Sequence, residues 1–525
     1  ELLKMALAIC TTLAEQTLDN EKYSGEIFQI KSLLRGEDFS ESLEYKSNFF
    51  NEEMIKYLGG EKEQCELALK YRKKGDLHKS QRNFEEADFF YRRTLFIREY
   101  IQKENDTEKN RSNLSIIYEK LAKLYMEQEK FDIAEEYFQK SLPLREQLVD
   151  ETGTVKSKEK LIAVYENLGE IQKSYKNFDN AEDFFRKAVV LREKILDENQ
   201  TEESKQKLIS SYDLIADLCK QSKKINDAEY FYQKSICLRE SLLENSNSVS
   251  LRLNLSANYG KFGDFYKSTK NIDKAEEFYQ KSISLNELVL NESNNINAKH
   301  DLGTSYARLG ELYEIRKEHV KAEKFYYKSV LFREDLVKEN ESVIKRRELS
   351  FSYDKLANIY KQTDNIDKAE EIYRKLLVID ERDVKELGTV DSKINLASTY
   401  GNLANLYRLQ NHLDKAEEFY LKSLIIDEQL VKDTDNIQAR QYLAVTYKNL
   451  GLIFESKGNI DIAEEYYKKC LAQREIIVEK DLNIENKRSL SRIYGFLCLF
   501  YKKTRVFINE AEDFCLKDLT LSESI

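Results

Sequence analysis

The chain has 525 residues, with 84 basic and 94 acidic side chains and a formal net charge of −10 at pH 7. It contains one proline and 16 glycines, which argues against collagen-like segments, proline-rich linkers and β-sandwiches built on Gly/Pro turns. Aromatic residues make up 11%, which is too many for a disordered chain. The negative charge and the lack of a basic block argue against nucleic acid as a partner. No run of about 18 uncharged apolar residues exists, so no membrane span is predicted.

Residues 1–61 do not fit the periodic pattern that fills the rest of the chain. We expect this segment to form degenerate or capping helices, and the Gly59–Gly60 pair marks its end. The sequence begins at Glu1 rather than at methionine. We therefore keep the alternative that the chain is part of a longer protein.

A repeat of 47 residues follows, and one alanine marks its register. The alanines are Ala87, Ala134, Ala181, Ala228, Ala275, Ala322, Ala369, Ala416, Ala463 and, after one inserted residue near Val506, Ala511. A tyrosine stands 16 residues before each of the first nine alanines, a small residue stands 12 before, and an aromatic residue stands four after. These spacings are helical periods, so each repeat is predicted to be two amphipathic helices. One such pair cannot bury its apolar face alone, and stacked pairs can.

The second helix of each repeat is predicted to start beside the alanine and to run for about 17 residues. An aspartate two residues before the alanine and a glutamate three residues after that aspartate, such as Asp132 and Glu135, resemble a capping box with the aspartate as N-cap. Pro143 lies inside a second helix. We expect it to kink that helix or to end it early, because proline removes one backbone donor.

The repeat slots resemble the tetratricopeptide repeat. One copy reads Tyr306, Leu309, Gly310, Tyr313, Ala322, Tyr326 and Ser329. The repeat is longer than the family's usual ~34 residues, and it looks like the repeats of kinesin light chains and of many bacterial repeat proteins. The resemblance implies an all-α, right-handed α-solenoid of about ten tandem helix-turn-helix repeats at 62–519, with a tail at 520–525.

The resemblance also implies where a partner binds. In this family the first helices line a concave groove that holds a peptide segment or a helix of another protein, and the slots one, two and five residues after the repeat tyrosine face it. In the later repeats the candidates are Arg308, Lys355, Asn358, Asn402, Asn405, Arg408, Lys448 and Asn449, of which Arg408 stands eight residues after its tyrosine and the others occupy these slots. In the earlier repeats they hold Glu119, Glu166, Glu170, Asp213 and Asp217. The groove is therefore expected to be acidic early and basic-polar late, with asparagines suited to a peptide backbone and cations suited to acidic groups.

A glutamate stands 12 residues after the alanine in nine copies, from Glu99 to Glu475. We interpret this row as a repeated salt bridge or hydrogen bond near the end of the second helix rather than as a row of ligands. The seven cysteines are widely spaced and include no C-x-x-C, which argues against disulfides and zinc. We therefore expect reduced core cysteines and a cytoplasmic location.

No catalytic constellation is present. The four histidines fall at unrelated slots, and no phosphate-binding or zinc-protease motif occurs, so no enzyme activity, cofactor or metal is predicted. The leading hypothesis is a protein–protein interaction scaffold. The alternative is a regulatory or sensor arm of a larger protein whose effector domain lies outside this chain, and a self-contained enzyme is the weakest of the three hypotheses. The oligomeric state is not predicted.

Overall fold

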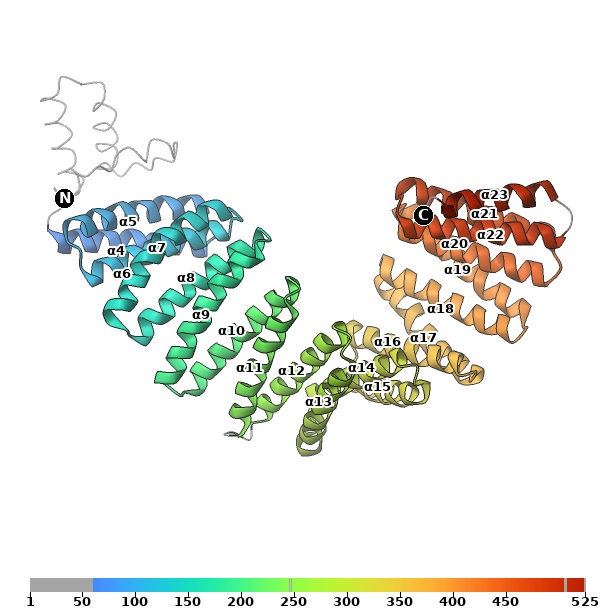
Figure 1. Ribbon diagram of the computed structural model, residues 1–525, viewed down its shortest axis with the longest axis horizontal. Coiled ribbons are helices and arrows are strands. Elements are labelled where there is room, and N and C mark those ends of the chain that lie inside the picture. The colour runs from blue at the N-terminus through green and yellow to red at the C-terminus, as the bar shows by residue number, and fades with distance from the viewer. Residues whose placement is uncertain (1–59, 245, 247, 505–507, 524–525) are drawn as a thin grey trace, which may run out of the picture. The chain divides into compact units, whose positions relative to one another are not determined.

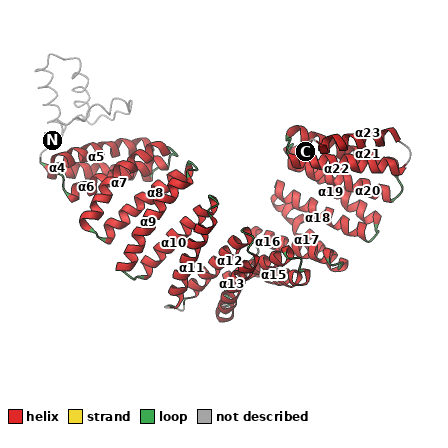
Figure 2. Ribbon diagram, viewed as in Figure 1, coloured by secondary structure: helices red, strands yellow, loops and turns green. Residues whose placement is uncertain are grey.

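The computed structural model describes residues 60–244, 246, 248–504 and 508–523. These residues form twenty α-helices and no strand (Figures 1 and 2). The helices come in ten consecutive pairs, one for each copy of the repeat, and each helix packs against its neighbours in the chain within its unit. The predicted all-α architecture of tandem helix-turn-helix repeats is confirmed. The predicted N-terminal segment 1–61 lies outside the described residues except for its last two, so its capping role stays a prediction.

The chain divides into two compact units, Glu1–Asn245 and Ser246–Ile525. In the described part of unit 1 the helices are α4 (Glu61–Ser80), α5 (Phe84–Glu104), α6 (Glu108–Met126), α7 (Phe131–Thr152), α8 (Val155–Ser174), α9 (Phe178–Glu198), α10 (Glu202–Gln221) and α11 (Ile225–Glu244). In that of unit 2 they are α12 (Val249–Ser268), α13 (Ile272–Ser293), α14 (Ile296–Ile315), α15 (His319–Glu339), α16 (Val343–Gln362), α17 (Ile366–Leu387), α18 (Val390–Leu409), α19 (Leu413–Thr434), α20 (Ile437–Ser456), α21 (Ile460–Lys480), α22 (Ile484–Thr504) and α23 (Ile508–Glu523). The even-numbered helix of each pair is called its A helix and the odd-numbered one its B helix. Repeats are numbered 1 to 10 along the chain. Helix α23 reaches into the segment predicted to be a tail.

Each B helix begins three residues before the repeat alanine, so the predicted capping box is wrong. Asp132 lies in the first turn of α7, and the N-cap is two residues earlier, at Lys130. In α9 and α13 the cap is an asparagine whose side-chain oxygen accepts from a backbone N–H of the first turn, at Asn177 and Asn271. The first-turn carboxylates remain favourable, because they lie at the positive end of the helix dipole.

The first-turn aspartate and a glutamate three residues later contact a cation in the turn that follows the next A helix. The ammonium of Lys224 lies 2.6 Å from Asp179 and 2.8 Å from Glu182, across two neighbouring repeats. The same contact is made by Arg316 with Asp273 and Glu276, and by Lys457 with Asp414 and Glu417. The acidic pairs therefore join one repeat to the next.

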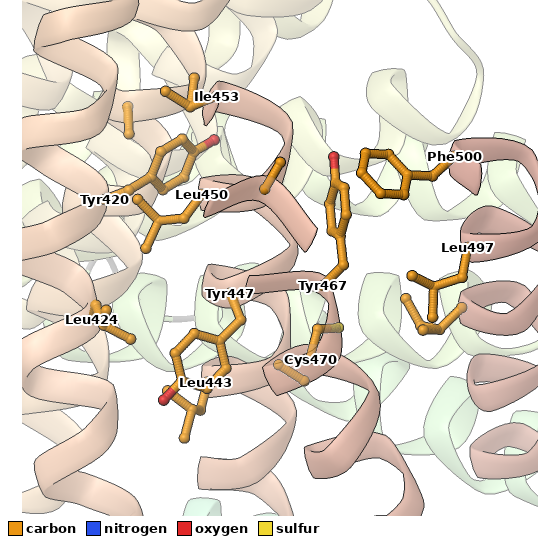
Figure 3. Close-up of a cluster of buried hydrophobic side chains, with 14 of the residues drawn as sticks. Tyr420, Leu424, Leu443, Tyr447, Leu450, Ile453, Tyr467, Cys470, Leu497 and Phe500 are labelled. Carbon is orange, nitrogen blue, oxygen red and sulfur yellow. The ribbon is translucent and has the colours of Figure 1, made fainter. Parts of the chain in front are cut away.

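The core of each repeat depends on a close approach of its two helices. A Cβ atom added to Gly451 on α20 would lie 2.3 Å from the ring of Tyr467 on α21, so the ring occupies the space of the missing side chain. The same ring contacts Phe500 of the next A helix (Figure 3), and it also contacts Phe496; the ring centroids are 5.0 and 4.8 Å apart, respectively. One aromatic side chain thus packs the helix pair and also the following repeat.

The glutamate row forms hydrogen bonds between repeats, which confirms its predicted structural role. The hydroxyl of a repeat tyrosine donates to the glutamate of the preceding repeat, at distances of 2.5 to 3.0 Å. The pairs are Tyr118–Glu99, Tyr165–Glu146, Tyr212–Glu193, Tyr306–Glu287, Tyr353–Glu334, Tyr400–Glu381, Tyr447–Glu428 and Tyr494–Glu475. Burial, together with the bond to Glu381, raises the pKa of Tyr400 to about 12.

Pro143 does not end its helix, and the predicted early end is wrong. Helix α7 continues for nine residues beyond it, to Thr152. Proline leaves the carbonyl of Gln139 without its helical donor. Both Pro143 and Gln139 are solvent-exposed, so water can bind that carbonyl and the cost of the missing bond stays small.

Two aspartates of unit 2 are buried without a cation. Asp380 is 3% exposed and Asp427 is 2% exposed. Their carboxylates accept from hydroxyls, namely Thr399 at 2.7 Å and Thr446 at 2.6 Å. Burial disfavours the charged form and raises the pKa of both groups to about 6.

We predict that Asp427→Asn stabilises the chain, because it removes a buried charge and keeps an oxygen that accepts from Thr446. The folded pKa lies above the ordinary value of 3.8, so this aspartate lowers stability at high pH, and its penalty fades as the pH falls through 6. The gain in unfolding free energy is expected to be at most about 3 kcal/mol at pH 7.5 and about half that at pH 5. Urea titration followed by circular dichroism measures it.

Asp433→Asn on the same helix is the matched control, since Asp433 is solvent-exposed and bound by Gln429 and Lys393. It should not stabilise the chain. A gain at position 427 that does not depend on pH would contradict this account of Asp427.

Candidate functional site

The eight predicted groove residues all lie on A helices of unit 2. They belong to α14, α16, α18 and α20, and each is half-buried. The structure therefore places them on four consecutive A helices. It also shows that they do not share one role.

Two of the asparagines support the core. The Tyr373 hydroxyl donates to Asn358 at 2.9 Å, and the Tyr420 hydroxyl donates to Asn405 at 2.7 Å. Each amide also donates to a backbone carbonyl of its own helix. A buried tyrosine needs a partner for its hydroxyl, and these slots supply it. Because their amides are engaged internally, Asn358 and Asn405 position the core tyrosines.

The internal role of Asn358 and Asn405 could have been recognised in the sequence by comparing the same slot in other repeats. Where the core ring is Tyr91 or Tyr279, the slot holds Asp76 or Asp264, and each accepts from the hydroxyl at 2.7 Å. Where the ring is a phenylalanine, as in repeat 2, no acceptor is required and the slot holds Lys123. Comparing the two slots across repeats would have identified a structural pair.

The cationic candidates differ in how far they are engaged. Arg308 lies 2.7 Å from Asp264 on the preceding A helix and is neutralised. The ammonium of Lys355 lies 5.5 Å from the ring of Phe351, and that of Lys448 lies 5.6 Å from the ring of Phe496.

The side chain of Arg408 donates a hydrogen bond to the hydroxyl of Tyr420, and burial raises the pKa of that hydroxyl to about 12. Within the described residues, Asn402 and Asn449 form no hydrogen bond through their side chains. Their donors and acceptors are therefore open to a ligand.

Most of the acids expected to form an acidic face in the early repeats have cation partners inside the chain. Arg145, on the B helix, lies 2.6 Å from Glu119 on the A helix of the same repeat, and the two side chains are 4% and 11% exposed. The equivalent pairs are Arg192–Glu166 at 2.8 Å and Arg239–Asp213 at 2.7 Å. Glu170 is paired with Lys173, and Asp217 accepts from the Tyr232 hydroxyl. Glu119, Glu166, Asp213 and Glu170 are thus paired with cations inside the repeats, whereas Asp217 is exposed and has no cation partner among the described residues.

The same pair of slots in repeat 9 holds two cations, Lys448 on α20 and Arg474 on α21. Neither has a carboxylate partner in the part of the chain that the structure describes. The Nε atom of Arg474 is buried without a hydrogen-bond partner there. Burial lowers the pKa of Arg474, which means that its environment disfavours the positive charge. Repeat 9 thus carries positive charge at a place where repeats 2 to 4 are neutral.

A cavity of about 640 Å³ lies in unit 1 and is lined mainly by α4 and α6. Four of its charged groups pair with each other, with Lys79 2.8 Å from Glu127 and Lys120 2.6 Å from Asp76. No helix in the described ranges is both long and apolar enough to cross a membrane.

The prediction that all cysteines are reduced is wrong for one pair. Cys498 and Cys515 form a disulfide, with Cα atoms 5.2 Å apart. Four others, Cys65, Cys219, Cys237 and Cys470, are free, and Cys10 lies outside the described residues. The pair occupies the small-residue slot and the aromatic slot, which contact each other in the repeats whose small residue is glycine. The two cysteines are 17 residues apart in the chain, so the sequence did not indicate this contact, which forms only when the two helices pair.

The burial of the ion pairs in unit 1 predicts how much unfolding free energy is lost when each acid is removed. Glu119→Ala leaves Arg145 buried and uncompensated, so we expect a loss of about 3 kcal/mol in unfolding free energy. Asp213→Ala should cost about 1 kcal/mol, because the Asp213 side chain is 30% exposed. Urea denaturation of the two variants in parallel gives both values. Equal losses would contradict a burial-dependent role for these acids.

Two family models, each described as tetratricopeptide repeat, match the chain. One matches residues 116–152 and 396–435, and the other matches 162–194, 257–287, 352–383 and 444–475. Each matched segment lies within one helix pair. No protein of curated function matches the sequence.

Several solved structures are similar at low identity. BtubC (BKLC) from P. vanneervenii is 21% identical over 48% of this chain and 91% of its own, with a TM-score of 0.38. A signal transduction ATPase with numerous domains and a tetratricopeptide repeat sensor, from Pyrococcus horikoshii, is 14% identical over 93% of this chain and 74% of its own, with a TM-score of 0.41. A putative kinesin light chain with nearly identical TPR-like repeats, from Podospora anserina, is 14% identical over 44% and 99%, with a TM-score of 0.35.

The family models match six of the ten helix pairs, and every match is in register with the 47-residue repeat. Repeats of this kind generally serve as non-catalytic scaffolds for protein–protein interaction. The chain thus contains tetratricopeptide repeats, at the six helix pairs that these models match.

Proposed function

We propose that the chain is an interaction scaffold whose unit-2 A-helix face binds an acidic peptide segment or helix of a partner protein. This face is defined by Lys355, Asn402, Arg408, Lys448 and Asn449. The observation that carries the proposal is the pair of cations in repeat 9, Lys448 and Arg474. The other three predicted residues, Arg308, Asn358 and Asn405, have partners inside the chain and support the face without forming it.

The cation pair supports an acidic ligand through a simple comparison of repeats. In repeats 2 to 4 the A-helix slot holds an acid that neutralises the B-helix arginine. In repeat 9 that acid is replaced by Lys448, so Arg474 has no carboxylate partner among the described residues. A buried charge without a counter-ion costs free energy. A carboxylate supplied by a bound segment would take the position of the missing acid and recover this cost.

The two free asparagines support binding of a main chain. Asn402 and Asn449 stand in the same slot of two neighbouring A helices, α18 and α20. A carboxamide donates and accepts hydrogen bonds at once, as a peptide group does. Two such groups on adjacent helices can therefore hold consecutive peptide groups of one ligand, while the cations bind its acidic side chain.

The alternative, that the chain is the sensor arm of a larger protein, stays a prediction. It depends on sequence outside the 525 residues. A sensor arm would use the same face, so the two roles do not compete at the level of this site.

A charge-restoring variant tests the proposal. Lys448→Glu rebuilds the acid–arginine pair of repeats 2 to 4, so we expect its thermal unfolding midpoint to rise. Random peptides displayed on phage and selected on the wild-type chain should be enriched in Asp and Glu, and binding of the selected peptides to Lys448→Glu should fall at least tenfold in fluorescence anisotropy titrations. Lys468→Glu, which makes the same charge change on helix α21, is the control and should bind as the wild type does.

Other outcomes separate the two parts of the proposal. Selected peptides that lose binding to Asn402→Ala/Asn449→Ala but bind Lys448→Glu unchanged would support the face and contradict the acidic ligand. Peptides that bind all variants equally would contradict the face itself.

A further inference from the structure

The last B helix of unit 2 is held by fewer buried side chains than the others. Among the described side chains of α23, only Ala511 is fully buried, at 1% exposure. Leu516 and Leu519 of the same helix are 60% and 56% exposed. The preceding B helix, α21, buries Ala463, Tyr467, Cys470 and Ile477. Elements with few buried contacts open at low free energy.

The disulfide of the last repeat takes the place of the packing contact that the other repeats use. In repeat 9 the ring of Tyr467 fills the space beside Gly451. In repeat 10 the same two slots hold Cys498 and Cys515, whose Cα atoms are 5.2 Å apart. Two cysteine side chains fill less space than a tyrosine ring, so packing at this contact is poorer. The covalent bond compensates for the missing ring.

We propose that Cys498 and Cys515 are a reversible thiol-oxidation site that controls whether α23 stays docked on α22. The oxidant is a low-molecular-weight disulfide. The thiolate of Cys515, which is half-buried, attacks one sulfur of that disulfide, forms a mixed disulfide and releases one small thiol. The thiolate of Cys498, which is 6% exposed, then attacks the sulfur of Cys515 and releases the second small thiol. Two protein thiols become one disulfide, and their two protons go to the two small thiols released.

Reduction leaves α23 with few anchors. The ring of Phe514 lies 5.7 Å from that of Tyr501 and 6.0 Å from that of Tyr494, and Asp518 accepts from Ser491. When α23 leaves, the rings of Tyr494 and Tyr501 on α22 lose the ring of Phe514 that packs against them. The redox state of this pair thus sets whether an apolar surface of repeat 10 is covered or open, independently of the peptide-binding face proposed above.

Hydrogen exchange of the whole chain tests this site. With oxidised glutathione, amides of α23 should be protected. With dithiothreitol, their exchange should become at least tenfold faster, whereas the α20–α21 pair, which contains no disulfide, should not change. Cys498→Ser/Cys515→Ser should exchange as the reduced chain does under both conditions. Cys498→Gly/Cys515→Tyr rebuilds the contact of Gly451 with Tyr467 and should stay protected with and without reductant.

Two results would overturn the proposal. One is non-reducing peptide mapping that finds no Cys498–Cys515 linkage after incubation with oxidised glutathione. The other is equal exchange of α23 in the oxidised and reduced chains. Because the glycine–tyrosine variant keeps the helix pair without cysteines, a folding failure of the serine variant does not obscure the result.

Discussion

Five of the described repeats are held by one close contact, in which an aromatic ring of the B helix occupies the space that a side chain of the A helix would take. Gly451 and Tyr467 show how closely the two helices approach, because a Cβ atom at the glycine would lie 2.3 Å from the ring. This contact brings the two helices together and fixes their register. It also buries a phenol hydroxyl when the ring is tyrosine, so it demands an acceptor such as Asn405. Many of the hydrogen bonds inside the repeats exist because a buried tyrosine hydroxyl needs an acceptor, and others form where successive helix pairs stack.

Polar links then join the pairs into units. The tyrosine–glutamate hydrogen bonds and the contacts of B-helix acids with the turn after the next A helix both cross from one repeat to its neighbour. Each link involves adjacent repeats only, so the stability of each unit is close to a sum of repeat and neighbour contributions. A change in one slot therefore alters its own repeat and the next one, and the rest of the array tolerates it.

This tolerance allows single repeats to depart from the pattern where another role requires it. Asp427 is a buried acid in a slot that holds arginine in other repeats. Lys448 places a second cation in the slot that pairs with Arg474, and Cys515 stands where other repeats have the core ring. Each departure costs stability that the regular slots would have supplied. Departures of this kind are where function is expected, because a local rule is broken without a gain in folding. All three lie in unit 2, which also carries the open asparagines.

The sequence by itself determined the repeat, the helical class and the slots that form the core, because helical periodicity and close packing act over a few residues. It also indicated the structural role of the glutamate row. It did not reveal that Asn358 and Asn405 are engaged by core tyrosines, or that Glu119 is neutralised by Arg145, since those partners are 15 and 26 residues away. Only the pairing of helices brings these groups within hydrogen-bond distance. For the same reason the contact of Cys498 with Cys515, and the unpaired charge of Arg474, were decided by the tertiary structure.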